Sequence, residues 1–330
     1  MARMKRSSKR LVAVGDLNGA YDVLVEILRE NGLVNRDLAW RGGRDELVQV
    51  GDLFNRGGGA ARALRLLLDL QRQARRVGGR VTVLLGNHEV MTALRHEGYC
   101  TEDEYLSFAS AAERRAWPDR VHRAMLRLIR QRARGIVLPI KPRLEAWKIE
   151  HVPGRAELRR ALGPRGVLGK ALRALPVVYQ SGDALFVHGG LLPRWAELGA
   201  EGLQARARED WALSRGKLWQ LSKRDSLFRS ADGPLWDRSL MRGGAEARAN
   251  LTRTLALFGA KRLIVGHTPS SSLRGGEAGR IQVLHQGRLI GIDVGLSEEP
   301  HAPRAALIID GSRGSEWTPD GTRVLWTARG

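Results

Sequence analysis

The fold of this chain is most constrained by short apolar segments that each run directly into a polar turn led by glycine. LVAV (11–14), ELVQV (46–50) and VTVLL (81–85) are followed by GDLNG, GDLFNRGGG and GNHE. Helical patterns separate them, across YDVLVEILRE and ARALRLLLDLQRQARR. Short strands that alternate with helices predict an α/β domain. Such a sheet binds its ligands beyond the carboxyl ends of its strands, where these turns would lie.

The rest of the chain continues this pattern around one different segment. Residues 101–175 are strongly basic, helical in pattern and without strand signals, so we expect a helical insertion that borders the site. Strands return in LPVVYQSGDALFVHGG, with a hairpin turn at Gly182 and Asp183, and in RLIVGHT. The tail from IQVLHQGRLIGIDVG onward predicts β-hairpins. Because no repeat or low-complexity linker interrupts it, residues 1–330 are expected to form a single domain with an insertion at about 101–175.

Composition predicts a globular chain without a membrane partner. Hydrophobic residues make up 43% of the sequence, and no apolar run approaches the roughly 18 residues of a spanning helix. The basic start leads into the apolar segment LVAV, which is too short for a signal peptide. The single cysteine, Cys100, fits a reducing compartment. We therefore expect a cytoplasmic protein.

The formal net charge of +20 favours anionic substrates. Its 55 Lys and Arg residues, against 35 Asp and Glu, are spread along the whole chain, as a compositional bias toward arginine would produce. A nucleic acid is the alternative partner. It is not favoured, because no basic run is interleaved with aromatic residues as a platform for single strands requires.

The strand ends collect side chains that suit a metal centre. Two carboxylates, an amide and several imidazoles are the mixed oxygen and nitrogen donors that bind Mn, Fe or Zn. The absence of cysteine sulfur from the set argues against a structural zinc site. Any one such turn is commonly structural, but five of them point together to a site. The residues are Asp16, Asp52, Asn87, His88, His188 and His267.

The motif series GDLNG, GDLFNRG, GNHE, VHGG and VGHTP resembles that of the calcineurin-like metallophosphoesterases, in the same order. It is most similar to the phosphoprotein phosphatases. GPLWDR and GHTP resemble the bacterial branch called Shewanella-like phosphatases. The resemblance implies a four-layer α/β/β/α fold, with two mixed sheets packed face to face, helices outside and the hairpin tail in the second sheet.

The same resemblance implies two divalent metal ions bridged by Asp52. Asp16 would bind the first metal, while Asn87, His188 and His267 would complete the second site. A hydroxide that bridges the metals would attack the phosphorus atom. Manganese is the expected metal, with iron or zinc as alternatives.

The substrate groups also follow from the resemblance. Arg56 and Arg238 would grip the phosphate oxygens, for which a forked guanidinium is well suited, and Asn87 would contact the substrate as well. His88 would protonate the leaving oxygen.

Two asparagines depart from the family pattern. Asn18 replaces a histidine ligand of the first metal, so we expect a weakened first site that still accepts Mn or Mg through an amide oxygen. Asn55 replaces the catalytic aspartate of GDxxDRG, which in the family orients the general acid. The loss of that negative charge should lower the pKa of His88.

The sequence thus predicts a metal-dependent phosphoesterase that hydrolyses phosphate monoesters. Its expected partners are a phosphorylated protein, the first choice, or a small phosphate ester. Because of Asn18 and Asn55, reduced activity is expected, and a degenerate phosphatase that binds phosphate or a phosphoprotein without turnover is the alternative. A nucleic-acid phosphodiesterase is the second alternative.

Overall fold

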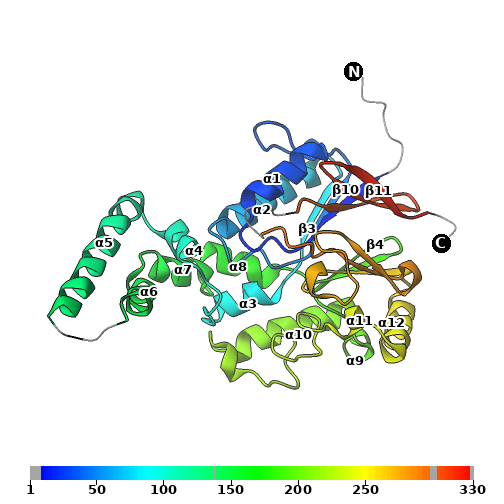
Figure 1. Cartoon of the computed structure of the whole chain (residues 1–330). Helices are drawn as coiled ribbons and strands as arrows, with labels where there is room; N and C mark the ends of the chain where they lie inside the picture. The colour runs from blue at the N-terminus through cyan, green and yellow to red at the C-terminus, as the bar shows by residue number, and fades with distance from the viewer. Residues whose placement is uncertain (1–8, 135, 137–138, 298–302, 328–330) are drawn as a thin grey trace.

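The computed structural model describes residues 9–134, 136, 139–297 and 303–327. Two mixed β-sheets form the centre of the molecule (Figure 1). The first has six strands in the order β11-β10-β9-β1-β2-β3, and the second has five in the order β4-β5-β6-β8-β7. The strands of the first sheet are β1 (Arg10–Val14), β2 (Glu46–Gln49), β3 (Arg80–Val83), β9 (Ala306–Asp310), β10 (Arg313–Thr318) and β11 (Gly321–Trp326). Those of the second are β4 (Val178–Ser181), β5 (Ala184–Val187), β6 (Arg262–Val265), β7 (Gln282–Leu284) and β8 (Leu289–Gly291).

Helices cover the outer face of each sheet, which confirms the expected α/β/β/α architecture. α1 (Tyr21–Glu30) and α2 (Ala60–Arg76) lie on the side of the first sheet, and α2 contacts β3. On the other side, α10 (Gly199–Leu213) contacts β4 and α12 (Ala245–Phe258) contacts β6. Shorter helices are α3 (Asn87–Ala93), α9 (Pro193–Ala196) and α11 (Ser239–Arg242), with 3₁₀ turns at Leu218–Gln220, Ser270–Ser272 and His285–Gly287.

Parallel pairing places the site-bearing turns at one edge of the sheets. β1 pairs with β2 and β2 with β3 in parallel, and β5, β6 and β8 pair in the same way. All five residues of β1 are buried, as expected for a strand covered on both faces. The carboxyl ends of these strands therefore converge on the space between the two sheets.

The C-terminal strands correct one expectation. β7 and β8 join the second sheet, as the resemblance implied, but β9, β10 and β11 extend the first sheet, where β9 runs antiparallel beside β1. The pairing of Leu11 with Ile309 joins segments almost a whole chain apart. Each strand is short, so local pattern alone cannot assign it to a sheet.

The described residues of the basic segment 101–175 form helices joined by short connections, without a strand among them. It contains α4 (Glu102–Phe108), α5 (Ala111–Ala133), α6 (Ile140–His151), α7 (Arg155–Leu162) and α8 (Val167–Ala174). α5 and α6 pack on each other and project away from the sheets (Figure 1). The ring of Trp147 stacks between Trp117 and His151, with centroid separations of 5.6 and 4.5 Å, and so joins the two helices.

Among the helices of the described residues, none combines the length and the apolar character that crossing a membrane would require.

Candidate metal centre

Five strand ends deliver the predicted metal-binding side chains to one place. Each of these residues is at most 6% exposed. They are Asp16 after β1, Asp52 after β2, Asn87 and His88 at the start of α3 after β3, His188 after β5 and His267 after β6.

The sharp reversal of the chain and the crowding between neighbouring turns explain why these turns begin with glycine. Asp52 and His267 have φ values of 55° and 61°, so the chain reverses sharply where each strand ends. A Cβ atom on Gly86 would lie 2.3 Å from Asp52 Oδ1, and one on Gly266 would lie 2.2 Å from Asp16 Oδ1. Glycine therefore leaves the space that the carboxylates of neighbouring turns occupy.

Asp52, His188 and His267 form the core of the centre. They can each present a ligand atom so that all three lie within 4.8 Å of one another. His188 Nε2 is 3.2 Å from Asp52 Oδ1 and 2.8 Å from Asn87 Oδ1, while His188 Nδ1 lies 2.9 Å from the carbonyl of Val50. A backbone partner on one ring nitrogen leaves the other directed at the centre, as is usual for a metal-binding histidine.

Asp16 and Asn18 lie on the side of the first predicted metal. Both carboxylate oxygens of Asp16 accept the backbone N–H of His267 at 3.1 Å. Asn18 is 4% exposed, and its Nδ2 donates to the carbonyl of Asp52 at 3.4 Å. Its Oδ1 is buried and has no hydrogen-bond partner among the described residues. A buried oxygen without a donor fits a cation, so the residues present suit a divalent metal.

Electrostatics within the centre are dominated by the packing of acids and imidazoles. Burial raises the pKa of Asp16 well above its ordinary value, and Asp293 adds to the rise. Burial would also raise the pKa of Asp52, but His188 and His88 outweigh it and hold that pKa below its usual range. Burial, together with His188, lowers the pKa of His267 to about 3. Carboxylates that are this close repel one another, and a bound cation would compensate their charge.

The predicted general acid is held by Asn55. His88 Nδ1 lies 2.6 Å from Asn55 Oδ1, while His88 Nε2 lies 3.8 Å from Asp52 Oδ2 and so faces the centre. Burial lowers the pKa of His88, Asp52 opposes the change, and Arg56 and Arg238 strengthen it. Both arginines therefore contribute positive charge at the His88 ring. The direction is the one expected from the sequence, but its largest cause is burial rather than the missing aspartate charge.

Two acids that the sequence analysis overlooked belong to the same region. Asp293 follows β8 in GIDVG, the same pattern of apolar strand and polar turn, so the strand-end rule could have found it. Burial raises the pKa of Asp293 to about 6. Glu89, the last residue of GNHE, is fully buried and accepts the backbone N–H groups of Asp52 and Leu53. Burial raises its pKa to about 7. It fixes the turn that carries Asp52.

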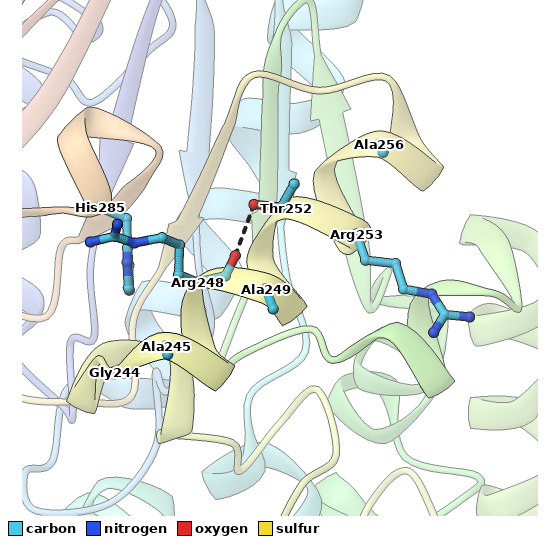
Figure 2. Close-up of a pocket in the computed structure, with 8 residues that line it drawn as sticks. All are labelled: Gly244, Ala245, Arg248, Ala249, Thr252, Arg253, Ala256 and His285. Carbon is cyan, nitrogen blue, oxygen red and sulfur yellow. Dashed lines mark hydrogen bonds between the residues drawn. The ribbon is translucent and has the colours of Figure 1, made fainter.

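Two surface pockets differ in their relation to the centre. One of about 840 Å³ lies along α12, between Arg248, Arg253 and His285, and none of its lining residues belongs to the centre (Figure 2). A second, of about 550 Å³, is lined by Trp236 and Arg238. The Trp236 ring lies 5.8 Å from the ring of His267. Trp236 therefore lines the second pocket and also contacts His267 of the centre.

Comparisons with known proteins agree with this architecture. A family model described as calcineurin-like phosphoesterase matches residues 9–271. Shewanella-like protein phosphatase 2 of Arabidopsis thaliana is 30% identical over 294 residues, which cover 88% of this chain and 72% of that protein. Shewanella-like protein phosphatase 1 of Plasmodium berghei is 25% identical and covers 80% of this chain and 62% of its own length.

A solved structure with the same fold is the cold-active protein tyrosine phosphatase of a psychrophilic Shewanella species. It superposes with a TM-score of 0.69 at 22% identity, over 97% of this chain and 81% of that one. This likeness shows the fold. Taken with the family model, which covers all five strand-end motifs, it means that the chain belongs to the calcineurin-like phosphoesterase family, whose members use divalent metals.

Proposed function

We propose that this chain is a metal-dependent hydrolase of phosphate monoesters, with phosphoproteins as its first substrate class. The observation that carries the proposal is the convergence of Asp52, His188 and His267 beyond the strand ends, next to the unpartnered oxygen of Asn18. Names of the relatives support the substrate class, because two are protein phosphatases. Residues 1–330 would act as one domain, and its location in the cytoplasm stays a prediction.

The centre would hold two divalent metals, manganese first among them. Asp52 would contribute to both sites. Asn87, His188 and His267 would complete one site, and Asp16 with the Asn18 amide oxygen would form the other. When bound, the metals would supply Lewis acidity, which activates water at neutral pH and neutralises charge on the phosphoryl group. Because an amide oxygen is a poor substitute for imidazole toward zinc or iron, the Asn18 site should prefer Mn.

The chain's own residues would orient the phosphate and supply a proton to the leaving oxygen. Arg56 and Arg238 would each present two donors to the phosphate oxygens, and Asn87 would donate through its amide. His88 would donate its Nε2 proton to the leaving oxygen as the P–O bond breaks. The pocket beside Trp236 and Arg238 would receive the part of the substrate that carries the leaving group.

Hydrolysis of p-nitrophenyl phosphate by metal-stripped protein, with Mn²⁺ added back, tests the proposal. The wild type should regain turnover, and Asp52→Asn should lose at least about a hundredfold in kcat, because it removes the charge shared by both sites. Asp69→Asn is the matched control, since Asp69 lies on α2 and pairs with Arg72 at the surface. If the wild type stays as inactive as Asp52→Asn with Mn²⁺, Zn²⁺ and Fe²⁺, the proposal is wrong.

A further inference from the structure

A buried chain of hydrogen bonds joins the predicted general acid to the helical insertion. His88 Nδ1 lies 2.6 Å from Asn55 Oδ1, and Asn55 Nδ2 donates to Glu104 Oε2 at 3.0 Å. The backbone N–H of Asn55 donates to the other oxygen, Glu104 Oε1, at 2.9 Å. Asn55 and Glu104 are both fully buried. Both carboxylate oxygens of Glu104 are thus engaged by a single residue.

The chemistry of the groups makes this chain directional. An ionised carboxylate can only accept hydrogen bonds, so the amide of Asn55 must turn its NH₂ toward Glu104. Its oxygen then faces His88 and can only accept. Nδ1 of His88 must therefore carry a proton, and the lone position left for proton exchange is Nε2, which faces the metal centre. Glu104 fixes the tautomer of His88 through Asn55 although it does not touch the ring.

Glu104 lies in α4, the first helix of the insertion. The stretch TEDEY has the pattern of a capping box, and Thr101 Oγ1 does accept the backbone N–H of Glu104 at 3.3 Å. The Glu104 carboxylate, however, accepts from Asn55 rather than completing the box. Burial raises the pKa of Glu104, and the two hydrogen bonds from Asn55 oppose that rise.

We propose that Glu104 is a positioning residue for the general acid, and that it replaces the aspartate charge which GDLFNRG lacks. The inference rests on the proposed function. In the family pattern a carboxylate contacts the histidine directly; here the carboxylate lies one residue farther away, and the amide of Asn55 connects the two. As the P–O bond breaks, Nε2 of protonated His88 passes its proton to the leaving oxygen. The neutral ring keeps the proton on Nδ1, which stays hydrogen-bonded to Asn55 Oδ1.

Glu104 also holds the backbone that precedes Arg56. Asn55 and Arg56 have φ values of 70° and 63°, so two successive residues lie in the left-handed region. The hydrogen bond from Asn55 N–H to Glu104 stabilises this turn. Misplacement of Arg56 would weaken binding of every phosphate ester alike. Misplacement of His88 would slow hydrolysis only where the leaving group needs a proton. The dependence on the leaving group therefore distinguishes the positioning of His88 from the positioning of Arg56.

The test compares leaving groups in the Glu104→Gln variant. Glutamine offers one acceptor oxygen to the two donors of Asn55, so the Asn55 amide loses its fixed orientation. We expect kcat/KM to fall about tenfold or more for an alkyl phosphate such as phosphoserine, and less than about threefold for p-nitrophenyl phosphate, whose leaving group departs without a proton. The Mn²⁺ concentration for half-maximal activity should not change. Glu102→Gln, on the same helix but bonded to Lys148 and Trp117, is the matched control.

The double variant Asn55→Asp with Glu104→Gln supplies the rescue. The new aspartate would accept from His88 Nδ1 and from the Gln NH₂, while the Gln oxygen would accept the backbone N–H, so the hydrogen bonds that join positions 88, 55 and 104 are all formed again. Alkyl phosphate hydrolysis should return to within about threefold of the wild type. Asn55→Asp alone places two carboxylates in contact and should lower Tm. If Glu104→Gln does not fold, the double variant alone serves as the test. It should then recover both the Tm and the leaving-group dependence of the wild type.

An equal loss for all leaving groups in Glu104→Gln, or a double variant no better than the single ones, would overturn the role of Glu104 and leave the proposed function intact. Absence of Mn²⁺-dependent turnover in the wild type would instead remove the proposed function, and this inference with it.

Discussion

At the scale of single residues, we expect Asn18 to have the largest consequence for metal binding. Its φ is 45°, and its side-chain oxygen is buried without a hydrogen-bond partner among the described residues. Histidine tolerates positive φ better than most residues. The backbone at position 18 can therefore adopt its conformation with the histidine that the family pattern places there.

Asn18→His should tighten the weaker metal site. Since imidazole is a better ligand than an amide oxygen for zinc and iron, the Zn²⁺ concentration for half-maximal activity should fall about tenfold or more. Asn18→Gly, which also tolerates positive φ, removes the oxygen and should raise the Mn²⁺ requirement by a similar factor. Activity titrations of the three proteins measure this order. Identical metal requirements in all three would mean that position 18 does not ligate metal.

At the scale of elements, Glu97 attaches the helical insertion to the main body. It follows α3, its side chain is 4% exposed, and it accepts from Arg155 Nε at 2.8 Å and from Tyr105 Oη at 3.1 Å. Arg159 contacts the same carboxylate. Burial would raise the pKa of Glu97, but Arg159 and Arg155 hold it below its ordinary value.

Glu97→Gln should destabilise the fold by about 1 to 2 kcal/mol at pH 7, since it removes a charge that two partly exposed arginines share. A lowered folded-state pKa gives stability that is present above the unfolded pKa, about 4.5, and is lost as pH falls toward the folded value. The difference from the wild type in urea unfolding should therefore shrink below pH 4.5. Glu157→Gln, an exposed control that pairs with Arg160, should change stability by less than about 0.5 kcal/mol. A difference independent of pH would contradict the ion-pair account.

At the scale of the whole molecule, the arm formed by α5 and α6 is strongly basic and lies outside the layered body (Figure 1). α5 carries seven arginines against two acidic residues. The arm begins and ends at adjacent points, because a Cβ on Gly154 would lie 2.8 Å from the backbone nitrogen of Ala109. It can therefore be shortened without parting α4 from α7.

Replacement of residues 111–151 by a short Gly-Ser linker should reduce the hydrolysis of protein substrates more than that of small substrates. Hydrolysis of p-nitrophenyl phosphate should stay within about twofold, whereas kcat/KM for an acidic phosphoprotein should fall about tenfold at low salt. The loss should diminish as ionic strength rises, because screening weakens the same attraction in the wild type. An equal loss on both substrates would show that the arm supports the centre itself.

The sequence predicted those features that depend on local pattern. α1 lies over residues 21–30 as its apolar spacing indicated, and the five strand-end turns converge because parallel strands share an edge. The sheet that β9 to β11 join was predicted wrongly, since pairing across the whole chain leaves no periodic signal. The contact of Glu104 with Asn55 was likewise missed: it joins residues 49 positions apart, and TEDEY alone indicated only a helix cap.

The most direct test of the metal-centre account is a titration of metal-stripped protein with Mn²⁺ in which bound metal and phosphatase activity are measured on the same sample. We expect no turnover without metal, and activity that reaches its maximum when two Mn²⁺ ions are bound per chain, the second more weakly than the first. Turnover that survives complete removal of metal, or two bound Mn²⁺ ions without turnover, would contradict it.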